Sequence, residues 1–222
     1  MWRRVGRSGA SRRRLTENAT AATYVSTVTV SLEPPGVPEM FRAALLGLRE
    51  AIAHPDRPGL DLQEVPAPKR LAPHAFAVSA EIHRDDEQVA SGRFVVLHDP
   101  AGQDGWRGDT RVVAFVSADV EAEMAADPSL ARVGWSWLTE SLQGRGAGHT
   151  AAGGTVTRTV SCRFGQLEDA DEASEVEVRA SWTPLPDAKG ALDLGVHLRA
   201  WTDLLCATAG LPPPGVLSLR GR

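Results

Sequence analysis

Two stretches in which apolar and polar residues alternate constrain the fold of this chain most strongly. In residues 74–84, Phe76, Val78, Ala80 and Ile82 fall on one side of an extended chain. Residues 175–183 repeat the pattern, because valine, alanine and tryptophan at even positions alternate with Glu175, Glu177, Arg179 and Ser181. Strands of this kind belong to a sheet that buries one face and leaves the other wet or against a partner.

The rest of the sequence predicts more strands and three helices. Apolar residues recur at helical spacing in residues 38–53, 127–144 and 193–209. Asp127-Pro128 is expected to start the second helix, and Gly144 to end it. Further strands are predicted at 88–98, 110–117 and 155–164, with a short extended piece at 60–65 and a helical turn at 119–126. Because residues 110–117 are apolar on both faces, that strand should be central.

These elements predict an α+β fold. Their order is α-β-β-β-α-β-β-α, with a five- or six-stranded, mainly antiparallel sheet and the helices mostly on one face. We expect a single domain at residues 38–214 and a flexible tail at 215–222. Residues 1–37 are expected to be a disordered, arginine-rich leader, and one interpretation is an over-extended gene start with the true initiator at a valine such as Val28, Val30 or Val37.

Charge and cysteine content exclude several classes of function. Six arginines lie in the first fourteen residues, and without them the chain has 18 basic against 28 acidic residues, a net charge of −10. An acidic body argues against direct nucleic-acid binding, since phosphate contacts need a basic face. Two cysteines, Cys162 and Cys206, fit a reducing compartment, and no apolar run is long enough for a membrane span. We therefore expect a cytoplasmic protein.

Long blocks of the sequence resemble one family of actinobacterial proteins, the domain of unknown function DUF3000. The blocks include GRFVVLHDPAGQDGWRGDTRVVA at 92–114, DPSLARVGWSWLTESL at 127–142 and HLRAWTDLLCATAGLPP at 197–213. The resemblance runs from about residue 38 to 214 and implies no activity, cofactor or catalytic residue. It also implies a gene neighbourhood with a ribonuclease D-like gene. The order of elements alone is similar to the type III secretion chaperone-like fold of YbjN-type proteins.

The segment from His98 to Asp109 is the sharpest candidate for a ligand site. It is expected to form a loop after a strand, where His98, Asp99, Asp104, Trp106 and Asp109 could converge on a small polar ligand or a cation. Calcium loops, however, use alternate positions, and this spacing does not match them. The alternative is a structural hairpin loop in which the aspartates form local turns and Trp106 covers the core.

Other motifs point away from known catalytic arrangements. The glycines of residues 144–148 follow a helix and precede a strand, which is the reverse of a dinucleotide-binding loop. Ser136 lies in mid-helix, and Cys162 and Cys206 lack an electropositive setting. The histidines are scattered, and His197 is expected in the core. The sequence therefore indicates no metal site, no cofactor and no identifiable catalytic residue.

Three hypotheses for function remain open. In the first, the protein is a non-enzymatic adaptor that binds a protein partner or a second copy through the polar sheet face, with Glu175, Glu177 and Arg179, or through Trp135. Trp135 and Trp137 are about 200° apart around a helix, so both cannot face the same core. In the second, the protein binds or converts a small molecule at the His98–Asp109 segment. In the third, it is an accessory factor in RNA processing.

Overall fold

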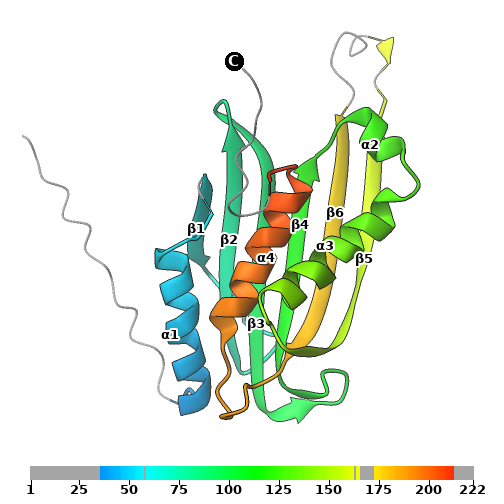
Figure 1. The fold of residues 1–222 in the computed structure, drawn as a ribbon. Helices are drawn as coiled ribbons and strands as arrows, with labels where there is room; N and C mark the ends of the chain where they lie inside the picture. The colour runs from blue at the N-terminus through cyan, green and yellow to red at the C-terminus, as the bar shows by residue number, and fades with distance from the viewer. Residues whose placement is uncertain (1–35, 58, 163, 166–172, 213–222) are drawn as a thin grey trace, which may run out of the picture. The chain divides into compact units, whose positions relative to one another are not determined.

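A computed structural model describes residues 36–57, 59–162, 164–165 and 173–212, and Figure 1 shows its fold. Residues 1–35 of the predicted leader, the acidic segment 168–172 and the predicted tail 215–222 lie outside the described residues. The elements are α1 (Glu39–Ala53), β1 (Leu60–Val65), β2 (His74–Arg84), β3 (Glu87–Gln103), β4 (Gly108–Asp119), α2 (Ala122–Ala126), α3 (Leu130–Gly144), β5 (His149–Ser161), β6 (Ala173–Pro184) and α4 (Leu194–Thr208).

The strands form one six-stranded sheet in the order β1-β2-β3-β4-β6-β5, and every neighbouring pair is antiparallel. The α+β class predicted from the sequence is therefore confirmed. The extended piece at 60–65 is the edge strand β1, and the helical turn near 119–126 is the short helix α2. The strand predicted to be central, β4, lies between β3 and β6.

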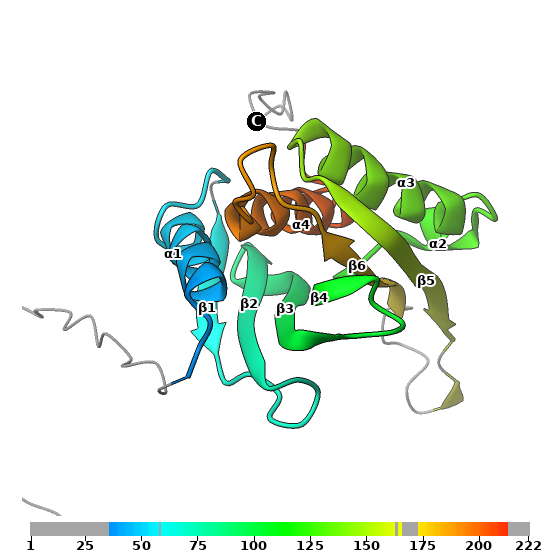
Figure 2. The same cartoon turned by 90° about the horizontal axis from the view of Figure 1, so that it is seen from below.

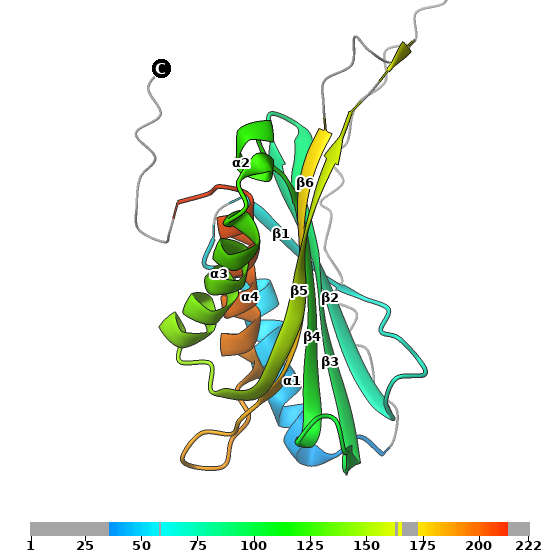
Figure 3. The same cartoon turned by 90° about the vertical axis from the view of Figure 1, so that its right-hand side faces the viewer.

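The helices cover one face of the sheet, as Figures 2 and 3 show. Helix α4 packs on the middle of the sheet against β3, β4 and β6, between α1 and α3. Its Trp201 lies beside Phe94 of β3, with a ring-centroid distance of 5.6 Å, and Phe94 also contacts Trp182 of β6 at 6.3 Å. All three side chains are fully buried, so the aromatic residues join the helix layer to the sheet.

Two details of α3 differ from the sequence prediction. The helix begins at Leu130 and not at Pro128, because the side chain of Asp127 accepts from the backbone N–H of Ser129 (2.8 Å) in a local turn before the helix. The left-handed residue at the other end is Gly146 (φ +66°) and not Gly144. The N–H groups of Gly146 and Ala147 donate to carbonyls of the last helical turn, which forms a Schellman cap.

The predicted loop at 99–109 is mostly strand. The pairing of β3 with β4 continues past an irregularity after His98 to Gln103 and Gly108, so that only a tight turn at residues 104–107 connects the two strands. Gly102 (φ +71°) lies in that irregularity. The glycines and aspartates therefore shape a β-hairpin.

The described residues cover the second face of the sheet over only part of its width. Ala77, Val95 and Leu97 are buried there under a small apolar cluster made by Trp106 and by residues of or next to the 66–73 connection. This cluster lies over β2 and β3. The outward side chains of β4, β6 and β5 lie beyond it.

Candidate functional site

His98 lies inside the core. Its side chain is 3% exposed and stacks on Phe41 of α1, with ring centroids 4.7 Å apart. Thr110 donates its hydroxyl hydrogen to Asp109 (2.9 Å), so the Nδ1–H of His98 donates to Thr110 Oγ1 (2.9 Å). Burial lowers the pKa of His98, partly offset by the charge of Asp109. Burial therefore favours the neutral imidazole, whose buried Nε2 has no hydrogen-bond partner among the described residues.

The other four predicted ligand residues do not gather around His98. Asp99 accepts from the backbone N–H of Ala101 (3.1 Å) and from the side chain of Gln103 (3.3 Å), which is a local turn. Asp104 is exposed at the tip of the hairpin, and Trp106 packs in the small cluster on the second sheet face. Only Asp109 lies near His98, with 3.9 Å between Oδ1 and Nδ1. In the described part of the chain, no three acidic, histidine or cysteine side chains are placed to hold a metal ion.

The candidate nucleophiles are structural residues or isolated. Ser136 donates its hydroxyl to the carbonyl of Val133 (2.9 Å) within α3. Cys206 is buried, and burial raises the pKa of its thiol. Cys162 is exposed beyond the end of β5. Within the described ranges, no serine or cysteine is hydrogen-bonded to a histidine, so these side chains form no nucleophile–base pair.

A surface of mixed chemistry that no described element covers lies on β4, β6 and β5, on the face opposite the helices. We call it the bare face and define it by its outward side chains: Val113, Phe115, Ser117, Thr155, Thr157, Glu175, Glu177, Arg179 and Ser181. A shallow hollow of about 490 Å³ lies on it, where Gly153 and Gly154 of β5 contribute no side chains. Val113 is 38% exposed beside this hollow.

Phe115 lies at the middle of the bare face. The guanidinium of Arg179 lies 5.5 Å from its ring centroid in a cation–π contact, and Arg93 is its neighbour on β3. Arg179 also pairs with Glu177 (2.9 Å), and its side chain remains 65% exposed. The aromatic ring is therefore flanked by basic side chains that reach solvent.

Arg111 holds the strands of this face together at one end. It donates to the hydroxyls of Ser181 (2.7 Å) and Thr183 (3.2 Å) on β6 and to the carbonyl of Ala151 (2.9 Å) on β5. Burial lowers the pKa of Arg111. Among the described residues it has no carboxylate partner, so this end of the bare face carries positive charge.

The other end of the bare face is acidic. Glu175 accepts a hydrogen bond from Ser117, and Glu175 and Glu177 pair in register with Asp119 and Ser117 of β4. The structure therefore brings together the predicted partner residues Glu175, Glu177 and Arg179. Trp135 is not among them, because its ring packs on Gly154 from the helix side of β5. Trp137, on the other side of α3, lines a cleft between helices.

Sequence reasoning missed Val113, Phe115, Arg111 and Arg57 as surface or cleft residues. The signal for the first two was present, since residues 110–117 are apolar on both faces and one of those faces had no helix assigned to cover it. Arg111 is the one charged residue in that otherwise apolar strand, which indicated that its side chain makes polar contacts in the fold. Arg57 gave no signal, because its neighbours in space come from distant parts of the chain.

A family model described as "Protein of unknown function (DUF3000)" matches residues 37–217, which is most of the chain. No curated protein and no solved structure matches the chain. The likeness to the YbjN-type fold therefore stays a prediction. None of the helices in the described residues is long and apolar enough to cross a membrane.

Proposed function

The chain belongs to the DUF3000 family of proteins of unknown function, and since that description carries no activity, we propose from the surfaces described above that it is a non-enzymatic protein-binding module. The partner docks on the bare face of β4, β6 and β5. The observation that carries the proposal is the uneven cover of the second sheet face. A small cluster with Trp106 buries Ala77, Val95 and Leu97, whereas Val113 on the next strand remains exposed.

The bare face has the composition of an interface. Phe115 and Val113 supply an apolar centre, and an aromatic ring with an arginine over it is a frequent energetic centre of protein contacts. The surrounding rim is polar, with Arg111 at one end and Glu175 at the other. A partner that fits presents an apolar patch with charges in the opposite order. A second copy meets this requirement when the two-fold axis lies in the interface near Phe115 and runs across the strands, because each end then faces its opposite.

The bare face ends at an exposed strand edge. Among the described strands β5 pairs only with β6, so its outer edge presents unpaired backbone N–H and C=O groups. Such an edge can add a strand from a partner. It therefore extends the same docking surface and does not require a second one.

The geometry gives less support to the other two hypotheses, a small-molecule site at the His98–Asp109 segment and a role in RNA processing. His98 is buried against Phe41 and Thr110 is also buried, so a ligand at the hairpin tip would not reach them. A role in RNA processing would have to come through a protein partner, since the chain without its six leading arginines has a net charge of −10.

The test compares how much of a protein partner is recovered with variants of the bare face and with control variants elsewhere on the surface. Tagged full-length protein is expressed in its native host, treated with ribonuclease, and its partners are quantified by mass spectrometry, while light scattering measures self-association. Val113→Glu and Arg179→Glu should reduce a near-stoichiometric partner, or the dimer, at least about tenfold. The matched controls on exposed helix positions, Leu46→Glu and Arg132→Glu, should leave it unchanged.

The result depends on whether only the bare-face variants lose the partner. A protein partner or dimer that both control variants retain and both bare-face variants lose supports the proposal. Equal recovery by all four variants, or a strictly monomeric protein with no stoichiometric partner, contradicts it. Circular dichroism of each variant checks that the loss does not come from unfolding.

A further inference from the structure

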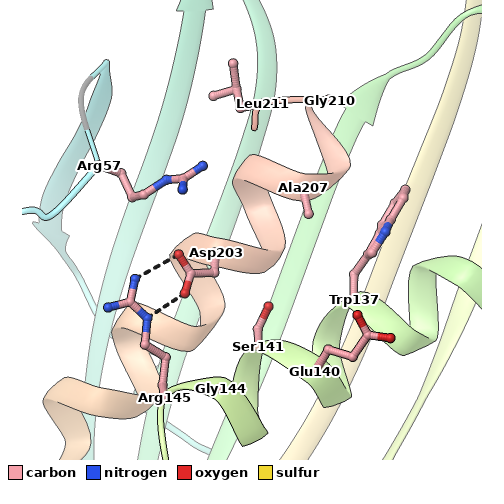
Figure 4. Close-up of a pocket in the computed structure, with 10 residues that line it drawn as sticks. All are labelled: Arg57, Trp137, Glu140, Ser141, Gly144, Arg145, Asp203, Ala207, Gly210 and Leu211. Carbon is pink, nitrogen blue, oxygen red and sulfur yellow. Dashed lines mark hydrogen bonds and ion pairs between the residues drawn. The ribbon is translucent and has the colours of Figure 1, made fainter. Parts of the chain in front are cut away.

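A cleft of about 800 Å³ lies on the helix side of the molecule, away from the bare face (Figure 4). Three segments far apart in the sequence form it: the turn after α1, the second half of α3 and the end of α4. Arg57 comes from the first segment, Trp137, Glu140 and Ser141 from the second, and Ala207 and Leu211 from the third. Its volume is that of a site for a small organic molecule.

Arg57 is a buried cation in the wall of this cleft. Its side chain points from the turn after α1 towards α4 (Figure 4), and the residue is only 7% exposed. One guanidinium nitrogen donates to the carbonyl of Pro212 (2.7 Å), and the thiol of Cys206 lies near the group. In the described ranges no carboxylate pairs with it. A buried guanidinium held only by neutral acceptors attracts an anion.

Arg145, the other arginine in the cleft, is already neutralised. It makes a two-point contact with Asp203, through Nε (2.5 Å) and Nη2 (2.9 Å), and a further ion pair with Asp56 (2.5 Å). Figure 4 shows the contact with Asp203. The two arginines therefore differ: Arg145 ties α3 to α4, whereas Arg57 forms no ion pair with a described residue.

The wall formed by α3 and the end of α4 has an apolar part and a polar rim. Trp137 offers an indole face, and Ala207 and Leu211 extend the apolar surface from the end of α4. Glu140 and Ser141 add an acceptor and a hydroxyl on α3. A ligand in this cleft therefore meets a positive group from the turn after α1, an apolar surface and a polar rim on α3.

We propose that the cleft binds a small organic anion with a flat apolar body. The carboxylate or other anionic group accepts from the N–H groups of Arg57 that Pro212 does not use, and the flat body lies against Trp137. A hydroxyl or amine on the ligand reaches Ser141 or Glu140. This site is separate from the bare face, so the two proposals are tested independently of each other.

A pair of aromatic probes that differ only in charge tests the proposal on the full-length protein. Indole-3-acetate carries the anion, and indole-3-acetamide is its neutral analogue. Isothermal titration and Trp indole N–H resonances measure binding. The acetate should bind at least about tenfold more tightly than the amide, the ratio expected for one charge-assisted hydrogen bond.

Variants locate the site and its charge. Arg57→Gln should remove the preference for the acetate, while Arg179→Gln on the bare face, also an arginine, should preserve it. Trp137→Leu should weaken the binding of both probes at least about fivefold. This second variant tests the site even if Arg57→Gln does not fold. Equal binding of the two probes by the wild type, a preference that survives Arg57→Gln, or no binding of either probe would overturn the proposal.

Discussion

The indole Nε1–H of Trp182 donates a hydrogen bond to Nδ1 of His197, 3.1 Å away, and both side chains are fully buried. This contact joins β6 to α4 inside the core. It requires an unprotonated Nδ1, so the imidazole is neutral and carries its hydrogen on Nε2. Burial, with the charge of His149 as a second cause and that of Asp193 in opposition, lowers the pKa of His197 to about 4.

The stability of the protein should fall as the pH falls from about 6.5 to 4. The pKa of His197 is below its unfolded value of 6.5, so in this window the unfolded state binds a proton that the folded state does not. The contribution is complete above pH 6.5 and decreases by up to about 1.4 kcal/mol per pH unit, about 3 kcal/mol in total. Urea unfolding at several pH values measures it.

The variant His197→Gln keeps an acceptor for Trp182 and removes the titration. Its unfolding free energy should depend less steeply on pH between 6.5 and 4 than that of the wild type. A smaller slope should remain, because burial also lowers the pKa of His98. An unchanged slope in the variant would show that His197 does not titrate in this way.

Gly92→Ala should destabilise the fold by about 1–3 kcal/mol. A Cβ at this position would lie 2.6 Å from the indole of Trp201 and 2.9 Å from the carbonyl oxygen of Phe115, the group that accepts from Trp201 Nε1. The close contact of α4 with the sheet therefore needs a glycine on β3. Gly105→Ala, in open space at the hairpin tip, is the control and should change the unfolding free energy little.

Two glycines at the end of α3 should respond in opposite directions to alanine. Gly146 has φ +66°, so Gly146→Ala should cost about 1–2 kcal/mol. Gly144 lies in the helix with open space around it, so Gly144→Ala should stabilise by about 0.5–1 kcal/mol. Thermal unfolding of both variants measures the two effects. The same sign for both would contradict the placement of the cap.

Asp193→Ala should destabilise the protein by about 1 kcal/mol. The carboxylate of Asp193 accepts from the backbone N–H groups of Gly195 (2.9 Å) and Val196 (3.2 Å) and so caps α4. Asp193→Ser keeps a capping oxygen and should recover most of the loss in urea unfolding. Failure of serine to recover any stability would assign the effect to something other than the cap.

Periodicity predicted the elements well where one face is buried and the other is wet. The alternation in 74–84 and 175–183 marks β2 and β6, and Asp193 marks the start of α4. Periodicity did not predict the strand ends within residues 99–109, because backbone pairing between Gln103 and Gly108 does not require apolar side chains. The insertion of β6 between β4 and β5 is also invisible in the sequence, since strand order depends on long-range pairing.

The candidate surfaces were predictable only in part. Glu175, Glu177 and Arg179 could be placed on one sheet face from their alternation alone. The alternation does not show that this face is bare. That depends on how far the apolar cluster with Trp106 extends over the sheet, and the tertiary fold determines this extent. The cleft depends on the approach of Arg57 to Pro212, 155 residues later in the chain, and no local pattern encodes such a distance.

The place of β6 in the sheet has a consequence for folding on the ribosome. Val112 pairs with Trp182 and Asp119 pairs with Glu175, so one edge of β4 has no native partner until the chain has been extended by roughly sixty residues. At about 5–20 residues per second, that edge waits roughly 3–12 s during synthesis. A nascent chain that stalls before Ala173 therefore displays one unpaired edge of an apolar strand, which is a substrate for chaperones and a nucleus for aggregation.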